Sequence, residues 1–424
     1  MTPAHLPDRL TICLWDFTWY TQTAPGAPFH SLDEAFRQAV ERGYNTVRVC
    51  AMPFLLFGSG IGTSRLTFQG LGGEYGQRTR WYDVRARATL DGRAHLLELF
   101  RGARRHDCYV IVSSWEYQQS PCFLADDSWH RALTAVPAAH RADVLADALA
   151  DLVDLLKAED LDDRVAFVEL HNEVQYSGLT AAVGPGEDVV LGLRPLLEAG
   201  IERFRARHPG TLVTANFARV PVGQLRGVPR NAAVAVFHPY VYGVLGQLVD
   251  EFALRDDTRP YPQERAHDEL LREGAPPLGE WMPPAEDRWR LSATLIRHRE
   301  VYTHDWCDPV KWDRWLYDRY GEHRRAMAET LDLCIAAAAD WAAVHGVPLV
   351  FGEGWVGYTP LHATFEEGPV GADICEHAVR ASAGVGAWGT VVCSNAAPHH
   401  PMWSDVALQQ RLNATVRAGA KVAA

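Results

Sequence analysis

Short apolar runs alternate with longer amphipathic stretches along most of this chain. Eight runs have the length and the apolar, often β-branched character of buried strands. The predicted strands are Leu10–Trp15, Thr46–Met52, Tyr109–Ser114, Val165–Leu170, Thr211–Asn216, Ala233–Phe237, Pro348–Phe351 and Trp388–Ser394. The predicted helices are Leu32–Arg42, Gly92–His106, Ala139–Glu159, Val189–His208, Glu322–His345 and Gly371–Val385. Ser31, with Glu34 three residues later, is a capping-box pattern before the first helix.

Strands interleaved with helices predict parallel βα units, and eight strands match a closed (β/α)8 TIM barrel. A doubly wound open sheet is the structural alternative. Because no repeat, low-complexity tract or linker divides the sequence, residues 1–424 are predicted to form one barrel domain.

Two stretches are longer than ordinary loops: residues 53–91, after the second strand, and 242–321, after the sixth. Both begin at the carboxyl end of a strand, so both are predicted to be irregular insertions on the face where barrel active sites lie. The second contains five tryptophans, which either stack on sugar rings or bury the insertion against the barrel.

Charge and cysteine content limit the kinds of binding partner and the cellular compartment that we expect for this protein. The chain has 53 acidic and 41 basic residues, a net charge of −12. An acidic surface repels phosphate backbones and anionic lipid, so neither nucleic acid nor a membrane is expected as a partner, whereas a homo-oligomer stays open. The first nine residues lack a signal pattern, and the eight cysteines include no C-x-x-C pair, which is typical of reduced thiols in a cytoplasmic enzyme.

Two glutamates end two of the predicted strands. The tetrad His171-Asn172-Glu173-Val174 closes Val165–Leu170, and Glu353 follows Pro348–Phe351. In a barrel, both positions face the same mouth. Retaining glycoside hydrolysis needs two carboxyl groups about 5–5.5 Å apart, one to protonate the leaving oxygen and one to attack carbon. Either glutamate alone is also compatible with a structural salt bridge, but together they predict a glycosidase.

With these motifs the chain resembles clan A of the glycoside hydrolases, the cellulase-like family 5 type, over residues 10–405. In that clan an Asn-Glu pair ends the fourth strand, and its glutamate is the acid/base; the matching pair here is Asn172-Glu173. A glutamate ending the seventh strand is the nucleophile, which corresponds to Glu353. The resemblance therefore implies these two catalytic residues.

Three further features match the clan. An arginine of the second strand lies near the nucleophile, as Arg48 would, and a His-x-Tyr motif at the sixth strand corresponds to His238-Pro239-Tyr240. A tryptophan after the eighth strand often floors the sugar site; Trp403 is better placed for this than Trp388.

The resemblance gives these residues roles that have physical reasons. Arg48 can keep a nucleophile ionised, Tyr240 can donate to the same carboxylate, and Asn172 can bind the sugar 2-hydroxyl. The structural alternatives are that Arg48 pairs with another acid and that His238 is a core histidine.

The third strand departs from the clan, because cellulase-type members commonly have a histidine there. Here the strand ends in Ser113-Ser114-Trp115-Glu116-Tyr117. Trp115 and Glu116 become substrate-binding candidates, with Glu116 either binding a sugar hydroxyl or neutralising Arg48. His171 either lines the pocket or packs inside, and Trp355, two residues after Glu353, is a further candidate. Glu169 lies deeper on its strand, where a buried ion pair is expected.

Other chemistries lack their motifs. The segment 352–357 matches G-x-G-x-x-G, but a loop follows it where a dinucleotide site needs a helix. There is no P-loop, G-x-S-x-G elbow, His-x-His or His-Glu-x-x-His, and the three lysines lie outside the predicted strands, which disfavours a Schiff-base aldolase. We therefore expect neither a metal nor a cofactor.

The sequence thus predicts a retaining glycoside hydrolase with a carbohydrate substrate. Long loops that wall the mouth into a pocket would favour exo-action on a small oligosaccharide or glycoside. A catalytically silent, sugar-binding barrel is the alternative, and a barrel isomerase or lyase acting on a free sugar is a remoter one.

Overall fold

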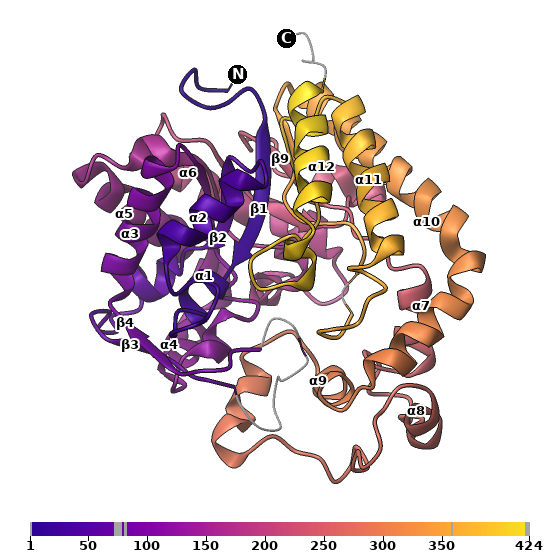
Figure 1. Ribbon diagram of the computed structural model, residues 1–424. Coiled ribbons are helices and arrows are strands. Elements are labelled where there is room, and N and C mark those ends of the chain that lie inside the picture. The colour runs from indigo at the N-terminus through magenta and orange to yellow at the C-terminus, as the bar shows by residue number, and fades with distance from the viewer. Residues whose placement is uncertain (1, 72–78, 80–82, 358, 420–424) are drawn as a thin grey trace.

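The computed structural model describes residues 2–71, 79, 83–357 and 359–419, and its centre is a ring of parallel strands surrounded by helices (Figure 1). The strands of this sheet are β1 (Leu10–Asp16), β2 (Thr46–Cys50), β5 (Tyr109–Ser113), β6 (Val165–Glu169), β7 (Val213–Thr214), β8 (Asn216–Ala218), β9 (Ala235–His238), β10 (Leu349–Phe351) and β11 (Gly389–Val391). Every pairing between neighbouring strands of the sheet is parallel.

The sheet has nine strands in the order β7-β6-β5-β2-β1-β11-β10-β9-β8. Its two end strands, β7 and β8, are halves of one strand separated by Ala215. One half pairs with β6 and the other with β9, so nine strands fill eight positions around the ring. The predicted (β/α)8 barrel is confirmed, and each predicted strand has a counterpart in it.

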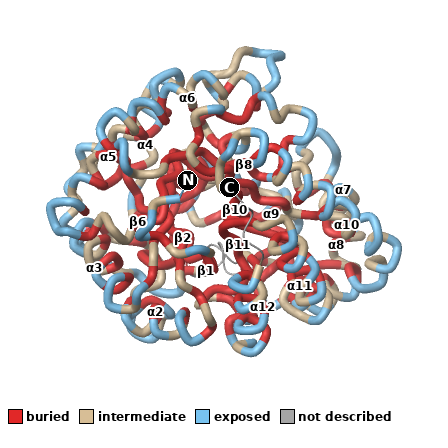
Figure 2. Tube along the Cα trace, turned by 90° about the horizontal axis from the view of Figure 1, so that it is seen from above, coloured by how far each residue is buried: buried red, intermediate tan, exposed pale blue. Residues whose placement is uncertain are grey.

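The barrel strands are buried on both faces. All residues of β1, β2 and β6 are buried, as parallel strands are when helices cover them. Seen from above, the buried positions form the inner ring and the exposed ones lie at the periphery (Figure 2). Their continuous apolar runs made these strands recognisable in the sequence.

The helices are α1 (Thr18–Thr21), α2 (Leu32–Glu41), α3 (Gly92–Arg105), α4 (Ser128–Ala135), α5 (Arg141–Ala158), α6 (Val189–Arg207), α7 (Val244–Glu251), α8 (Gln263–Glu269), α9 (His298–Asp305), α10 (Pro309–His345), α11 (Pro369–Gly384) and α12 (Val406–Ala418). The capping box predicted before α2 is half formed. Ser31 Oγ accepts a hydrogen bond of 3.2 Å from the Glu34 N–H, but the Glu34 carboxylate accepts from Arg37.

Both long insertions contain regular structure that the sequence prediction missed. Within 53–91 lie a π-helical turn (Phe54–Gly58) and the antiparallel pair β3 (Leu66–Phe68) and β4 (Ala88–Leu90). Residues 72–78 and 80–82 of this insertion lie outside the described residues. The insertion 242–321 holds α7, α8, α9 and the first turns of α10.

The prediction was wrong about where α10 begins. The helix starts at Pro309 and not at Glu322, because Asp308 caps it by accepting hydrogen bonds from the Val310 and Lys311 N–H groups. Proline suits the first helical position because it has no N–H to leave unpaired.

The last helix, α12, was not predicted. It packs against α11 and β1 and completes the outer layer. Two of its buried residues are the polar Gln409 and Asn413, which interrupt the apolar periodicity. Their amides donate to the main-chain carbonyls of Met402 and Arg42, at 3.1 and 2.9 Å.

Candidate active site

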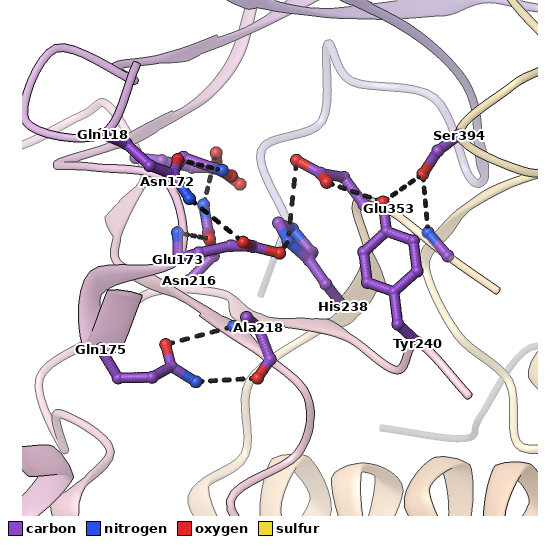
Figure 3. Close-up of polar contacts among 12 residues, drawn as sticks. Gln118, Asn172, Glu173, Gln175, Asn216, Ala218, His238, Tyr240, Glu353 and Ser394 are labelled. Atoms are coloured by element: carbon purple, nitrogen blue, oxygen red, sulfur yellow. Dashed lines mark hydrogen bonds and ion pairs between the residues drawn. The ribbon is translucent and has the colours of Figure 1, made fainter. Parts of the chain in front are cut away.

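Glu173 and Glu353 meet at the carboxyl ends of the barrel strands (Figure 3). One atom each from Glu173, His238 and Glu353 lies within 4.8 Å of the other two. The glutamates are nearly buried, with 15% and 10% of their side chains exposed. The barrel therefore brings together two carboxylates that are far apart in the sequence.

Glu173 follows β6 in a left-handed conformation with φ of 42°. Its N–H donates to Asn216 Oδ1 at 2.6 Å, which fixes the turn. Its carboxylate accepts from Gln118 Nε2 at 3.2 Å, and its other oxygen lies 3.2 Å from His238 Nδ1. Burial raises the pKa of Glu173 to about 7, so much of this carboxyl group is protonated near neutrality.

Glu353 follows β10 in a more cationic and hydrogen-bonded setting. Arg48 Nη1 donates to one of its oxygens at 2.7 Å, and the Tyr240 hydroxyl donates to the other at 2.9 Å. Burial raises the pKa of Tyr240, so its phenol stays protonated and able to donate. The Tyr240 oxygen also lies 2.6 Å from Ser394 Oγ. These contacts hold both carboxylate oxygens of Glu353 in position.

Arg48 links Glu353 to two residues at the carboxyl end of β6, Glu169 and Asn172. Its side chain is fully buried in β2, where it donates to Glu169 at 2.6 and 3.0 Å and to Asn172 Oδ1 at 2.7 Å. Asn172 donates in turn to Gln118 Oε1 at 2.8 Å. Arg48 thus pairs with Glu169, as the structural alternative supposed, and with Glu353 as well.

His238 lies between the two glutamates. Burial lowers the pKa of its imidazole to about 4, so the ring is neutral near pH 7. Its Nδ1 is 3.2 Å from Glu173 and 3.7 Å from Glu353. A neutral ring protonated at Nδ1 can donate to Glu173, the nearer of the two carboxylates.

A pocket of about 440 Å³ opens above these residues, a volume within the range of small-molecule sites. Five sequence-predicted site residues line it: Trp115, Asn172, Glu173, Tyr240 and Glu353. The insertion 242–321 contributes Arg255, Leu295, Ile296, Arg297 and Glu300 to the wall. The described part of the insertion 53–91 supplies no lining residue.

Glu116 does not take either of the roles expected for it. Its buried carboxylate accepts from the N–H groups of Phe54 and Leu55 at 2.9 and 2.8 Å. It also accepts from Ser114 Oγ and Trp129 Nε1, at 2.9 and 3.1 Å. The residue therefore anchors the π-helical turn and does not border the pocket.

Three aromatic candidates are also directed away from the pocket. His171 packs inside, where its Nε2 accepts from the Tyr117 N–H at 3.0 Å. Trp355 is fully buried and donates to the Val392 carbonyl at 2.8 Å. Trp403 donates to Gln38 of α2 and lies 4.2 Å from the Arg42 guanidinium, outside the barrel. The short 3-10 helix at 401–404 directs Trp403 toward α2.

Sequence reasoning missed several lining residues, among them Asp16, Gln118, Arg219 and Ser394. Asp16 ends β1, so the argument that singled out Glu173 could have found it. Burial raises its pKa, and the neighbouring charge of Glu353 adds to that effect. Gln118 and Arg219 lie on loops and carry no comparable sequence signal.

Among the described residues, one group could hold a metal ion, and it is Glu173, His238 and Glu353. Two carboxylates and an imidazole are equally what a proton-transfer site contains. The described residues also include no helix that is long and apolar enough to cross a membrane.

The ring of strands and the paired glutamates define a barrel of the clan A, family 5-like glycoside hydrolase type. The chain belongs to the sugar-binding cellulase-like family, whose model matches residues 12–226. No curated protein matches the chain.

A solved structure from Parabacteroides distasonis ATCC 8503, provisionally named a glycoside hydrolase, has a TM-score of 0.69 and 18% identity. The match covers 98% of this chain and 95% of that one, and it shows a shared fold.

Two looser matches are named family 5 enzymes. One is a tri-modular endo-β-1,4-glucanase from Bacillus licheniformis complexed with cellotetraose, at 13% identity and TM-score 0.49, covering 99% of this chain and 61% of that one. The other is a mannosidase from Rhizomucor miehei, at 12% identity and TM-score 0.48, covering 97% and 93%. At these scores neither supports an inference about this chain.

Proposed function

We propose that this protein is a retaining glycoside hydrolase in which Glu173 is the acid/base and Glu353 the nucleophile. The observation that carries the proposal is the approach of the two side chains, whose nearest oxygens lie within 4.8 Å. Retaining enzymes have carboxyl groups about 5–5.5 Å apart, whereas inverting enzymes leave about 6.5–9.5 Å for a water molecule.

The two environments support a division of roles. Glu173, with its raised pKa, holds a proton for the glycosidic oxygen as the bond to the leaving group breaks. Glu353 attacks the anomeric carbon and forms a glycosyl ester while Arg48 and Tyr240 keep its oxygens in position. The ionised Glu173 then takes a proton from water, which attacks the anomeric carbon and releases Glu353.

Neighbouring residues would assist without exchanging protons. Asn172 lines the pocket beside Glu173 and is held by Arg48 and Gln118, so its amide is fixed for a sugar hydroxyl. Neutral His238 can donate to the Glu173 carboxylate once that group has lost its proton. Trp115 offers an apolar surface to a sugar ring. This double displacement requires neither a metal nor a cofactor.

We propose exo-action on a small oligosaccharide or glycoside. Residues 295–297, with Arg255 and Glu300, wall one side of the pocket, and an open polymer-binding cleft would lack such a wall. In this proposal residues 1–424 form one catalytic domain, and the insertion 242–321 sets the length of chain that can enter.

The test combines turnover with covalent trapping. Wild-type protein is assayed on aryl glycosides covering α- and β-pyranosides and furanosides, and a 2-deoxy-2-fluoro glycoside of the best sugar is used to accumulate the ester. We expect turnover, and peptide mass spectrometry should place the added glycosyl mass on Glu353. Glu353→Ala should abolish turnover, whereas Glu202→Gln, at an exposed position of α6, should retain it. Labelling of another residue would contradict the assignment.

The second candidate is a sugar-binding barrel without catalysis, which the description of the matching family as sugar-binding favours. Such a protein would bind sugars in calorimetry and turn over no aryl glycoside. It would also bind equally well after Glu353→Gln.

A further inference from the structure

The lining of the pocket is divided by charge. Its arginines all lie on the side that follows the fifth and sixth barrel strands: Arg219 after β8, and Arg255 and Arg297 in the insertion after β9. The opposite side, after the first, seventh and eighth strands, has the carboxylates Asp16 and Glu366 with neutral polar groups such as Asn395. In a protein of net charge −12, a wall with three arginines needs an explanation.

Arg219 is held in place through its main chain. It has a left-handed φ of 79°, and its N–H donates to the His238 carbonyl at 2.7 Å. The amide of Gln175 pairs with the main chain of Ala218, the preceding residue, through bonds of 2.8 and 3.2 Å (Figure 3). A strained conformation secured from two sides is a feature of functional positions.

Two guanidinium groups share one aromatic ring. Arg219 and Arg255 each lie 5.4 Å from the centre of the Tyr242 ring, which also lines the pocket. Arg255 forms an ion pair of 2.6 Å with the buried Glu300, whereas Arg219 forms none with any described residue. Like charges gathered on one ring repel each other, and an anion placed between them relieves that repulsion.

The other charges facing this wall do not cancel it. Arg297 lies at the exposed rim and is 3.5 Å from Asp257. Glu173 is the remaining acid on this side, and burial keeps much of it protonated near neutrality. The charges of Arg219 and Arg255 act on Glu173 and lower its pKa against the larger effect of burial, and all three residues line the same pocket.

We propose that the leaving group of the substrate carries an anionic oxygen group, a carboxylate or a sulfate, that Arg219 and Arg255 bind. The inference rests on the proposed function, because the acid that protonates the leaving oxygen must face the leaving group. The transferred sugar would occupy the opposite side, where carboxylates and amides suit neutral hydroxyls. The substrate is thus a neutral glycosyl unit joined to an acidic sugar or another acidic aglycone.

The test compares leaving groups on one sugar. Glycosides of 4-nitrophenol, of its ring-carboxylated form and of its ring-sulfonated form are assayed with wild-type protein, Arg219→Met and Arg272→Met. Arg272 is an exposed arginine stacked 4.4 Å from Trp306 in the same insertion, but it does not line the pocket. The same compounds are titrated calorimetrically into the Glu353→Gln protein, with and without Arg219→Met.

Wild-type protein should prefer an anionic leaving group over the neutral one by at least about tenfold in kcat/KM, as expected for a hydrogen bond to a charged group. This ratio should fall toward one in Arg219→Met and remain in Arg272→Met. A preference confined to the carboxylate or to the sulfonate identifies which anion is bound.

Turnover without any such preference would overturn this inference and leave the hydrolase proposal standing. Arginine-dependent binding of the anionic compounds without turnover would support an anion site at Arg219 and Arg255, but it would remove the hydrolase proposal and with it the assignment of that anion to a leaving group. Absence of both turnover and binding across the sugar panel would remove both.

Discussion

At the scale of single residues, the two glutamates differ in what surrounds them more than in how deeply they lie. Both are nearly buried, yet Glu353 has an arginine and a tyrosine as donors, whereas Glu173 has an amide and a neutral imidazole. Donors that favour the anion hold a nucleophile ready, and their relative absence allows burial to keep an acid protonated. The asymmetry supports the proposed roles and predicts a pH dependence.

The activity of the wild-type protein should fall as the pH rises through about 7. The raised pKa of Glu173 means that its proton is present below this value and lost above it, so the general acid disappears on the alkaline side. Glu173→Gln should lower kcat/KM by about 10²–10⁴ on an alkyl glycoside, which needs protonation of the leaving oxygen. The measurement is the pH profile of kcat/KM.

A 2,4-dinitrophenyl glycoside provides the control, because its phenolate leaves without a proton. Formation of the glycosyl ester from it, measured as a burst, should persist in Glu173→Gln and lose the alkaline fall. An unchanged alkaline limb in the variant would assign that limb to another group.

At the scale of elements, short segments are fixed by main-chain groups that need partners. The π-helical turn 54–58 begins where Glu116 accepts two main-chain N–H groups, and α10 begins where Asp308 does the same. The contacts of Glu116 connect the insertion 53–91 to the loop after β5, and they use a carboxylate that we had predicted in the site.

Glu116→Gln should therefore weaken the fold without weakening the chemistry. The side-chain nitrogen of the glutamine would face N–H or O–H groups that now donate to the Glu116 carboxylate. Leaving these donors without an acceptor should lower the free energy of unfolding by about 1–3 kcal/mol. Chemical denaturation followed by tryptophan fluorescence measures this cost. The kcat/KM per folded molecule should stay at the wild-type value. A large loss of kcat/KM would show that Glu116 contributes to the active site after all.

A pair of glycines in α11 offers a second test. At Gly371 a Cβ atom would lie 1.6 Å from the Glu366 carbonyl oxygen, so the backbone beside a pocket-lining residue would have to move. Gly371→Ala should lower the free energy of unfolding by about 1–3 kcal/mol or more.

Gly384→Ala is the matched control in the same helix. Among the residues that the structure describes, no atom outside the adjoining backbone lies within 4 Å of a Cβ at this position, and its φ is not left-handed. We expect a gain of about 0.4–1 kcal/mol from the smaller entropy of the unfolded chain. Equal effects of the two substitutions in thermal unfolding would contradict the steric argument.

At the scale of the whole molecule, the insertion after the sixth strand and the barrel mouth together make the pocket. The wall that it builds beside Glu173 leads to a prediction about products. Because the leaving group faces this wall, an oligosaccharide labelled at its non-reducing end should lose single units or short pieces from its reducing end, which chromatography of early time points would show. Early release of internal fragments of many lengths would remove the proposal of exo-action.

The sequence by itself determined the barrel, because eight apolar runs and the helical stretches between them follow from local periodicity. It also determined that Glu173, Glu353, Asn172 and Tyr240 reach the mouth, since residues at the carboxyl ends of parallel strands share one face. The sequence did not predict the helices in 242–321 or α12. Capping groups and polar core residues interrupt the apolar periodicity by which a helix is recognised.

Only the tertiary structure decided which loop side chains turn toward the pocket. After the last residue of a strand, side chains no longer alternate regularly between its two faces. Gln118 therefore faces Glu173, while Glu116, two residues earlier, anchors a helical turn. Trp403 lies against Arg42 at the end of α2 for the same reason, and Arg219 reaches the pocket through a left-handed turn that no local sequence pattern predicts. Side-chain direction in a loop depends on which distant main-chain and side-chain partners the fold supplies, and these exist only once the ring of strands has formed.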